Sequence, residues 1–245
     1  MVEPLFHWDG HEASVGQTIN LSGAEAKHAV QVRRMRVGEA IQVSNGQGLR
    51  VRGAVSGAEP ASLSVLIAEV AQEARPRVEL VLVQALAKGD RDELAIQAAT
   101  ELGAMGVVPW QAERSISRWD GPKIQKSVDR WQAIVDEAAK QALRVWNPVV
   151  QQPVTSKQLA QGVKEFDLVL VLDPTADTGL TAVALPKTGR VALVVGPEGG
   201  ISQAELELFE SAGAKRVHLG SPILRTSTAG MAAISALQAS LGNWA

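Results

Sequence analysis

The sequence predicts an α/β protein with two domains, a small N-terminal β-barrel and a larger C-terminal domain built on a mostly parallel sheet. Up to about Val70, short strand-like stretches alternate with clusters of Gly, Asn, Ser and Pro. From Val78 onward, apolar runs of strand length alternate with segments of helical periodicity, which indicates parallel strands joined by helices. We place the boundary at the polar segment Ala71–Pro76, so that residues 1–72 form one domain and residues 73–245 the other.

Composition excludes several classes of protein. The 245 residues include no cysteine, which excludes disulfides, thiolate metal sites and a cysteine nucleophile. Residues Met1–Gly10 lack the basic and apolar segments of a signal peptide, and no apolar run approaches the ~18 residues of a membrane span. We therefore expect a cytoplasmic protein that uses neither a membrane nor a metal. The formal net charge of -2 means that any RNA contact must rest on local groups of Lys and Arg.

Short strands are expected in the N-terminal domain. They are predicted at Ala40–Val43, Leu49–Val55 and Leu63–Ile67. In the middle strand, a period of two places the apolar residues on one face and Arg50 and Arg52 on the other. Gly46 and Gly48 lie between two strands with no helix after them, so they predict a hairpin turn rather than a dinucleotide-binding loop.

The C-terminal domain begins with a continuous apolar run typical of a strand covered on both faces. Strands are predicted at Val78–Leu86, Val107–Val108, Asp167–Leu172, Arg190–Val195 and Arg216–Leu219. Helices are predicted at Asp90–Gly103, at Lys123–Val145, after Ser202 and after Ser227. Ser202 and Glu205 form a capping box, and Gly213 ends that helix. The last helix carries Ile234, Leu237 and Leu241 on one side, and we expect this side to pack against another subunit.

Two loops carry the strongest functional signal. The first, Gly196–Gly200, follows a predicted strand and precedes a helix, where glycines allow ligand atoms to approach the backbone. It lacks the signatures of a P-loop and of a dinucleotide-binding loop, and alone it fits either a ligand loop or a tight turn. The second, Leu219–Ala229, repeats the arrangement, with a helix start that we expect to be capped by Ser or Thr. Two such loops at neighbouring strand ends can enclose one ligand. A buried Arg225 would require an anionic partner.

Further segments complete a family pattern together with these loops. They are Lys27–Arg34 with Gly38 and Glu39, Gln84–Asp90, Glu101–Gly103, Glu113–Ser115, and Glu137–Ala142 with Arg144. Over almost its whole length the chain resembles the bacterial ribosomal RNA small-subunit methyltransferase E family of the SPOUT superfamily. The resemblance implies a PUA-like β-barrel, an α/β domain with a trefoil knot at about residues 168–240, and a homodimer. It also implies S-adenosylmethionine as cofactor and methylation of N3 of uracil 1498 in the 16S rRNA of the small ribosomal subunit.

The same resemblance implies which residues form the site. The cofactor pocket is expected at Leu172, Gly196, Pro197, Glu198, Gly199, Gly200, Leu219, Gly220, Ile223, Leu224, Arg225 and Thr228. We expect Arg225 to stabilise the negative charge that develops on the uracil. Glu198 is a candidate base, or a support for the loop or for a cofactor hydroxyl. Ser227 stands where the family often has Glu, and Ala98 where it often has Lys, so the general base stays unassigned.

RNA contacts are expected from the N-terminal domain. The candidates are Arg33, Arg34, Arg36, Arg50 and Arg52, although each alone is also typical of a solvated surface. Two alternatives remain open. A related knotted enzyme could methylate a ribose 2′-hydroxyl of tRNA or rRNA, and a protein of the same fold could bind RNA without catalysis.

Overall fold

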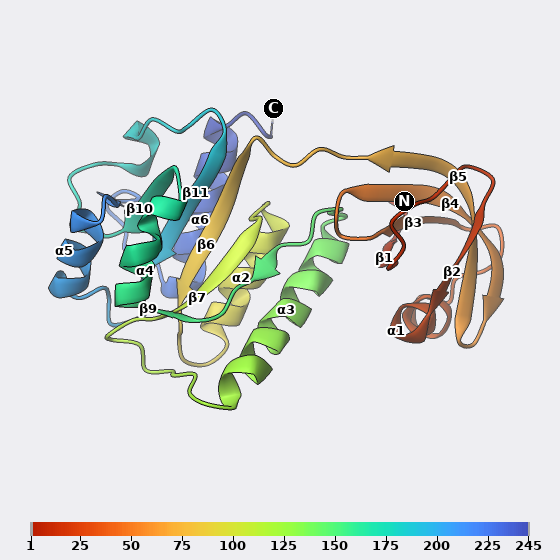
Figure 1. The fold of residues 1–245 in the computed structure, drawn as a ribbon, viewed down its shortest axis with the longest axis horizontal. Coiled ribbons are helices and arrows are strands. Elements are labelled where there is room, and N and C mark those ends of the chain that lie inside the picture. Colours follow the sequence, from red (N-terminus) through yellow and green to blue (C-terminus); the bar gives the residue numbers. More distant parts are fainter. Residues whose placement is uncertain (1, 245) are drawn as a thin grey trace. The chain divides into compact units, whose positions relative to one another are not determined.

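The computed structural model describes residues 2–244, and the chain divides into two compact units. The first unit combines Met1–Arg75 with Ala139–Asn147, and the second combines Pro76–Ala138 with Pro148–Ala245 (Figure 1). The sequence held no signal that Ala139–Asn147 would group with the first unit. None of the helices described between residues 2 and 244 has the length and apolarity needed to cross a bilayer.

The first unit is built on a curled sheet of five strands in the order β1, β3, β4, β5, β2. Its strands are β1 (Leu5–His7), β2 (Thr18–Ser22), β3 (Ala40–Ser44), β4 (Leu49–Glu59) and β5 (Ser62–Gln72). Between β2 and β3 the chain forms the short helix α1 (Gly23–Lys27) and the π-helical turn η1 (His28–Val32). The three predicted strands are confirmed, and Gly46 and Gly48 form the hairpin turn with φ of 70° and 95°. The sheet is a half-barrel rather than a closed barrel, because β1 and β2 are its two edges in the described chain.

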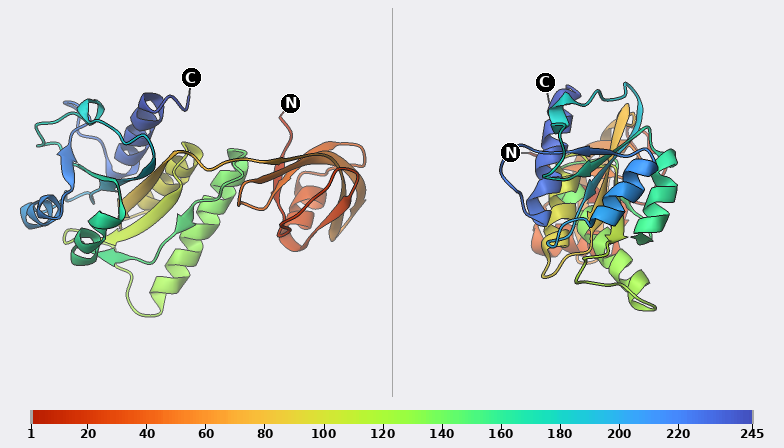
Figure 2. Two further views of the ribbon diagram at one scale, coloured as in Figure 1. Left: turned by 45° about the horizontal axis from the view of Figure 1, so that its top comes forward. Right: turned by 90° about the vertical axis from the view of Figure 1, so that its left-hand side faces the viewer.

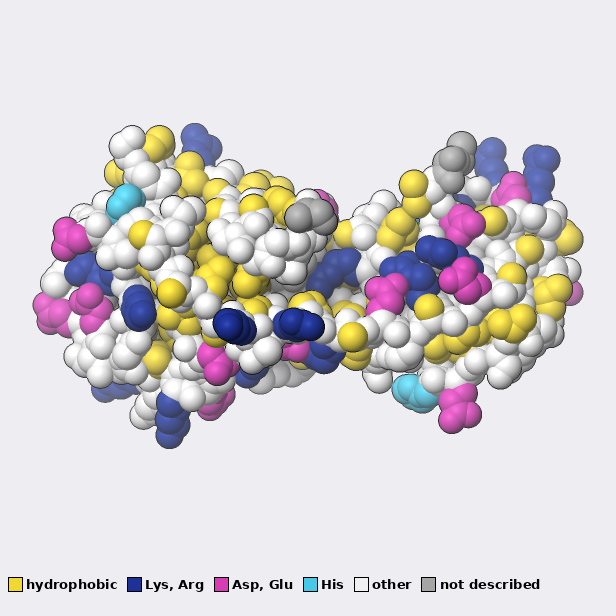
Figure 3. Space-filling view, turned by 90° about the horizontal axis from the view of Figure 1, so that it is seen from above, with side chains coloured by type: hydrophobic (Ala, Val, Ile, Leu, Met, Phe, Trp, Pro, Cys, Tyr) yellow, Lys and Arg dark blue, Asp and Glu magenta, His cyan; other side chains and the backbone are white. Residues whose placement is uncertain are grey.

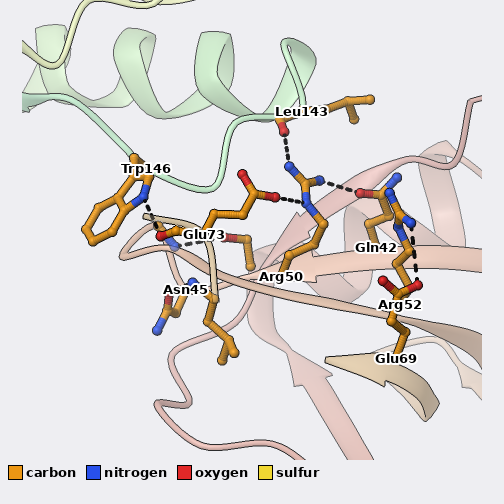
Figure 4. Close-up of polar contacts among 11 residues, drawn as sticks. Gln42, Asn45, Arg50, Arg52, Glu69, Glu73, Leu143 and Trp146 are labelled. Carbon is orange, nitrogen blue, oxygen red and sulfur yellow. Dashed lines mark hydrogen bonds and ion pairs between the residues drawn. The ribbon is translucent and has the colours of Figure 1, made fainter. Parts of the chain in front are cut away.

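The segment after the long helix belongs to this first unit. The helix α3 (Lys123–Gln141) ends before the predicted Val145, because Leu143 adopts a left-handed conformation with φ of 54°. The turn brings polar groups to the sheet (Figure 4). The Arg50 guanidinium donates to the Leu143 carbonyl at 3.0 Å, and the Trp146 indole N–H donates to the Glu73 carbonyl at 3.1 Å. The end of α3 is therefore set by contacts to residues distant in sequence.

The second unit is built on a seven-stranded sheet in which every pairing is parallel. Its strands are β6 (Val78–Ala85), β7 (Gly106–Gln111), β8 (Val149–Val150), β9 (Val154–Thr155), β10 (Leu168–Leu172), β11 (Gly189–Val195) and β12 (Lys215–Val217). Their order is β12, β10, β11, β6, β7, β8, with β9 also paired to β7. The predicted parallel sheet is confirmed, and β8 and β9 are additions too short for periodicity to reveal.

Helices cover both faces of this sheet (Figures 1 and 2). They are α2 (Arg91–Glu101), α3, α4 (Ser156–Gly162), α5 (Gln203–Ser211) and α6 (Thr226–Ser240), with short 3-10 turns at Val163–Glu165 and Leu180–Ala182. Alternate residues of β6 point to opposite faces, so Leu80 and Leu82 pack with α2, α3 and α6, whereas Val81 and Val83 pack with α4 and α5. The continuous apolar run in β6 therefore reflects burial on two sides.

The last helix differs from its prediction in two respects. It begins at Thr226, one residue before Ser227, and Arg225 is the residue before the helix, with no side-chain cap. Ile234 and Leu237 are buried in the core of their own unit, so the expectation that they pack against another subunit is wrong. By contrast, the capping box of Ser202 and Glu205 at the start of α5 is confirmed.

Candidate functional site

A cavity of about 540 Å³ lies at the carboxyl ends of β10, β11 and β12 in the second unit. It is lined by Arg91, Leu172–Pro174, Val195–Glu198, Gly200, Ile201, Val217–Gly220, Pro222–Thr226 and Ala229. Cavities of roughly 300–1,000 Å³ at the carboxyl ends of parallel strands are the usual place for small ligands in open α/β sheets. The two loops predicted from the sequence meet at this cavity, one after β11 and the other after β12.

Most of the residues expected around the cofactor line this cavity, and two do not. Gly199 faces the loop after β7 instead, because its carbonyl accepts a hydrogen bond from Arg114 Nη1 at 3.1 Å. A Cβ atom at position 199 would lie 3.2 Å from Arg114 Cβ, so a larger residue would require Arg114 to shift by a few tenths of an ångström. Thr228 lies in the first turn of α6, where its hydroxyl donates to the Arg225 carbonyl at 3.2 Å.

Several lining residues were absent from the sequence prediction. They are Arg91, Asp173, Pro174, Val195, Ile201, Val217, His218, Pro222, Thr226 and Ala229. Pro222, Thr226 and Ala229 lie within the second predicted loop, and the others except Arg91 adjoin Leu172 or one of the two loops. Arg91 follows Lys88–Asp90, the loop after β6, and its place at the cavity depends on the pairing of β6 with β11.

The carboxylate of Glu198 is held by two donors. Its Oε1 atom accepts a hydrogen bond from Arg91 Nη1 at 2.8 Å and another from the Lys88 backbone N–H at 3.2 Å. Burial raises the pKa of Glu198, but hydrogen bonds from its own backbone, Arg91 and Lys88 outweigh burial and leave the pKa below its ordinary value. A carboxylate so stabilised is a weak proton acceptor, which favours the supporting role over that of a base.

A buried hydroxyl joins the two loops. Thr226 Oγ1 donates to the Gly196 carbonyl at 2.8 Å and accepts from Gln84 Nε2 at 2.9 Å. Gln84 is fully buried near the end of β6, and its Oε1 atom has no hydrogen-bond partner within the described residues. The predicted Ser or Thr cap on α6 is therefore wrong for a physical reason, since the Thr226 hydroxyl binds the neighbouring loop. This hydrogen-bond chain fixes the ends of β6 and β11 and the start of α6 relative to one another.

Arg225 is exposed at the cavity rather than buried. Its guanidinium has no hydrogen bond or ion pair with any residue from 2 to 244. No anion among the described residues neutralises this cation, so it is available to an anionic group that enters the cavity. The neighbouring Ser227 is buried and carries no carboxylate, so it supplies neither a counterion nor a base.

A second carboxylate at the cavity is neutralised from within the sheet. Asp173 follows β10 and accepts hydrogen bonds from the Thr175 N–H at 3.0 Å and from Arg216 Nε, on β12, at 2.7 Å. Burial raises the pKa of Asp173, but the hydrogen bonds from Thr175 and Arg216 outweigh burial, so the pKa lies below its ordinary value. Asp173 therefore ties β10 to β12 as a charged group.

The arginines proposed for RNA contact fall into two groups. Arg33, Arg34 and Arg36 are exposed, whereas Arg50 is held by Gln42, Glu73 and the Leu143 carbonyl (Figure 4). Arg52 forms an exposed pair with Glu69 at 3.4 Å. On the face shown in Figure 3, Lys and Arg are dispersed among Asp and Glu. This distribution agrees with the net charge, so the expected RNA contacts would rest on small groups of cations.

Family models match both parts of the chain. A model described as an RNA methyltransferase domain matches residues 74–238, which is more than half of the chain. A second model, described as an RNA methyltransferase PUA domain, matches residues 21–68. The cavity and both loops lie within the first match, and the curled sheet overlaps the second.

Known proteins of similar sequence and structure carry consistent names. The chain is 38% identical, over 100% of its length and 94% of the relative, to ribosomal RNA small subunit methyltransferase E of Mycobacterium bovis. It is 34% identical to the Bacillus subtilis protein of the same name, over 90% of this chain and 89% of the relative. The Neisseria gonorrhoeae structure of that name, bound to S-adenosyl methionine, matches with a TM-score of 0.87 and 29% identity, covering 97% of this chain and 98% of the other. The chain belongs to the ribosomal RNA small subunit methyltransferase E family.

Proposed function

We propose that this chain transfers a methyl group from S-adenosylmethionine to N3 of a uridine in 16S rRNA, the position uracil 1498. The observation that carries the proposal is the cavity at which both family loops meet an arginine without an internal counterion. Family membership supports an rRNA substrate, and the choice of N3 rests on the family resemblance of the loops and of Arg225. An rRNA substrate also implies work where ribosomes are assembled, in the cytoplasm.

The cavity suits S-adenosylmethionine by its shape and chemistry. Leu172 and Leu219 supply apolar contacts, and Ile223 and Leu224 expose apolar surface that a bound adenine ring would cover. Gly220 has φ of 106° and presents backbone rather than a side chain to a ligand. When bound, S-adenosylmethionine supplies a methyl group already activated on a sulfonium, so the protein has to position and polarise the acceptor.

The residues of this chain divide the work of methyl transfer. Alignment of the uracil N3 with the donor, through the two loops, removes the entropy of encounter and supplies several kcal/mol. Arg225 stabilises the negative charge that develops as the N3 proton leaves. Glu198, ionised and bound to Arg91, holds its loop rather than taking this proton.

The assembly and topology of the chain are part of the same proposal. We infer a homodimer and a trefoil knot at about residues 168–240 from the family resemblance. The chain crosses over β10 on its way from β11 to β12, a crossover that the knotted connection requires and that unknotted α/β sheets also contain. Sedimentation of the purified protein tests the dimer. Stretching the chain from its ends in an optical trap tests the knot, which would shorten the fully extended length.

RNA binding by the first unit completes the proposal. We assign the contacts to Arg33, Arg34, Arg36 and Arg52, and we leave out Arg50 because its guanidinium is occupied. The division of labour is then an RNA-binding first unit and a methyltransferase second unit, which differ from the expected domains of residues 1–72 and 73–245 mainly because Ala139–Asn147 groups with the first unit.

Incubation with labelled S-adenosylmethionine and small ribosomal subunits from cells lacking the gene tests the activity. Nucleosides released from the 16S rRNA should contain labelled 3-methyluridine, and reverse transcription should stop at the modified base, because N3 methylation blocks base pairing. Label in a 2′-O-methylated nucleoside would show the alternative activity instead. Failure of the protein to bind S-adenosylmethionine in a calorimetric titration would reject the enzyme and favour an RNA-binding protein without catalysis.

A further inference from the structure

Two cations flank the first loop of the cavity, and they follow β6 and β7, the next two strands on one side of β11. Lys88 comes from the loop after β6, and its backbone N–H binds Glu198 at 3.2 Å. Arg114 comes from the loop after β7, and its guanidinium binds the Gly199 carbonyl at 3.1 Å. Both residues are exposed and neither lines the cavity. They therefore lie beside the ligand site and outside it.

The carboxylates around this loop have hydrogen-bond or ion-pair partners, whereas Lys88 and Arg114 have no carboxylate partner among the described residues. Glu198 is paired with Arg91, and Glu113 accepts a hydrogen bond from Ser202 at 2.6 Å. No carboxylate among residues 2–244 forms an ion pair with Lys88 or Arg114. Lys88 and Arg114 are thus exposed cations without an ion-pair partner among the described residues, in a protein whose net charge is -2.

A uridine that enters the cavity brings its own backbone to the rim of the cavity. Enzymes that modify a base take it out of the base stack. Only the ribose then separates the base in the cavity from the two flanking phosphates, so these phosphates lie close to the rim. Proteins commonly bind nucleic-acid phosphates through exposed Lys and Arg, and these contacts fix the register of the protein on the nucleic acid.

We propose that Lys88 and Arg114 bind the RNA phosphates that flank the target uridine. This inference rests on the proposed function, and it places RNA contacts in the methyltransferase unit itself. Arg114 would have two roles, because its guanidinium also donates a hydrogen bond to the Gly199 carbonyl. The same side chain would then connect the bound RNA to the cofactor loop.

The double variant Lys88→Gln, Arg114→Gln tests the proposal, with Lys164→Gln as the matched control. Lys164 is an exposed lysine of the same unit. It precedes the amino end of β10, whereas the cavity lies at the carboxyl ends of the strands. Binding of each protein to small ribosomal subunits from cells lacking the gene is measured by co-sedimentation at several salt concentrations. Calorimetric titration with S-adenosylmethionine reports whether the loop is intact.

The removal of one phosphate contact lowers the salt dependence of log K by about 0.7–0.9, or about five- to eightfold in affinity at 0.1 M salt. We expect the double variant to lose about this much subunit affinity for each cation, in addition to the effect on S-adenosylmethionine binding of losing the Arg114–Gly199 hydrogen bond. Lys88→Gln alone should lose one such factor with an unchanged affinity for S-adenosylmethionine, because only the Lys88 backbone contacts the loop. Arg114→Lys, which keeps the charge, should retain most of the affinity. An affinity and a salt dependence equal to those of Lys164→Gln would overturn the proposal, as would a loss confined to S-adenosylmethionine binding. The proposed function fails separately, if the unaltered protein forms no 3-methyluridine.

Discussion

Arg225 differs from Arg91, which also lines the cavity, and from Arg216, which binds the lining residue Asp173, because it has no carboxylate partner among the described residues. Arg91 is paired with Glu198 and Arg216 with Asp173, whereas no described residue neutralises Arg225. An exposed cation at the mouth of a cavity costs little to maintain before the ligand arrives, and its interaction strengthens as water is excluded. This is the arrangement expected of a group that acts on a charge present only during the reaction.

Replacement of Arg225 by alanine should reduce single-turnover methylation by about 10²- to 10³-fold, because the charge on the uracil is no longer stabilised. S-adenosylmethionine should still bind, since the loops are held by other contacts. Quenched-flow measurement of methyl transfer, with calorimetry of cofactor binding, checks both statements. An unchanged single-turnover rate with bound cofactor would show that Arg225 has no electrostatic role.

Thr226→Val should destabilise the site far more than Thr226→Ser. Valine leaves the Gly196 carbonyl and the buried Gln84 amide without their partner, a loss of about 1–3 kcal/mol for each group left unpaired. Serine keeps both hydrogen bonds. Urea unfolding and the S-adenosylmethionine dissociation constant should both separate the two variants. Equal behaviour of Val and Ser would mean that the hydroxyl does not join the loops.

Secondary structure was predictable where local pattern and tertiary environment agree. The apolar runs of β6, β10 and β11 reflect burial on both faces, and the Ser202 capping box is a local signal with a local cause. The end of α3 was not predictable, since Leu143 leaves the helical conformation for contacts with residues near Arg50. Likewise, the place of Arg91 at the cavity depends on strand order, which periodicity does not encode.

The tie between β10 and β12 should depend on pH. The pKa of Asp173 lies below its ordinary value of 3.8 in the folded protein, so its stabilising effect is complete above about pH 4. The effect is lost as the pH falls through the lowered pKa. Asp173→Asn should therefore be less stable than the unaltered protein at neutral pH, by about 1.5–3 kcal/mol for the lost charged hydrogen bonds. Urea unfolding at pH 7 and at pH 3 should show this difference shrinking in acid. A difference independent of pH would mean that the Asp173 charge does not hold Arg216.

At the scale of the whole molecule, the second unit is not one continuous segment of the chain. Ala139–Asn147 interrupts the second unit and groups with the first, where Gly48 N–H donates to the Val145 carbonyl at 2.8 Å. The sequence indicated two domains from a change of pattern near Pro76, but it treated each domain as one continuous segment. The grouping of Ala139–Asn147 with the first unit is a tertiary property that rests on several contacts between residues distant in sequence, among them hydrogen bonds to Leu143 and Trp146.

Arg50→Ala should therefore destabilise the first unit, whereas Arg52→Ala should not. Arg50 is largely buried and joins Gln42, Glu73 and the Leu143 carbonyl, so its loss should cost about 1–3 kcal/mol. Arg52 forms an exposed pair whose contribution is about 0–1 kcal/mol. Hydrogen exchange of the strands in the first unit compares the two variants. Equal protection in both would contradict the structural role of Arg50.

The most direct test of the account is a map of methylated uridines in 16S rRNA from cells with and without this gene. We predict one 3-methyluridine that disappears on deletion, returns with the unaltered gene, and does not return with Arg225→Ala. A map that is unchanged by deletion, or one in which a ribose 2′-O-methyl group disappears instead, would contradict the account.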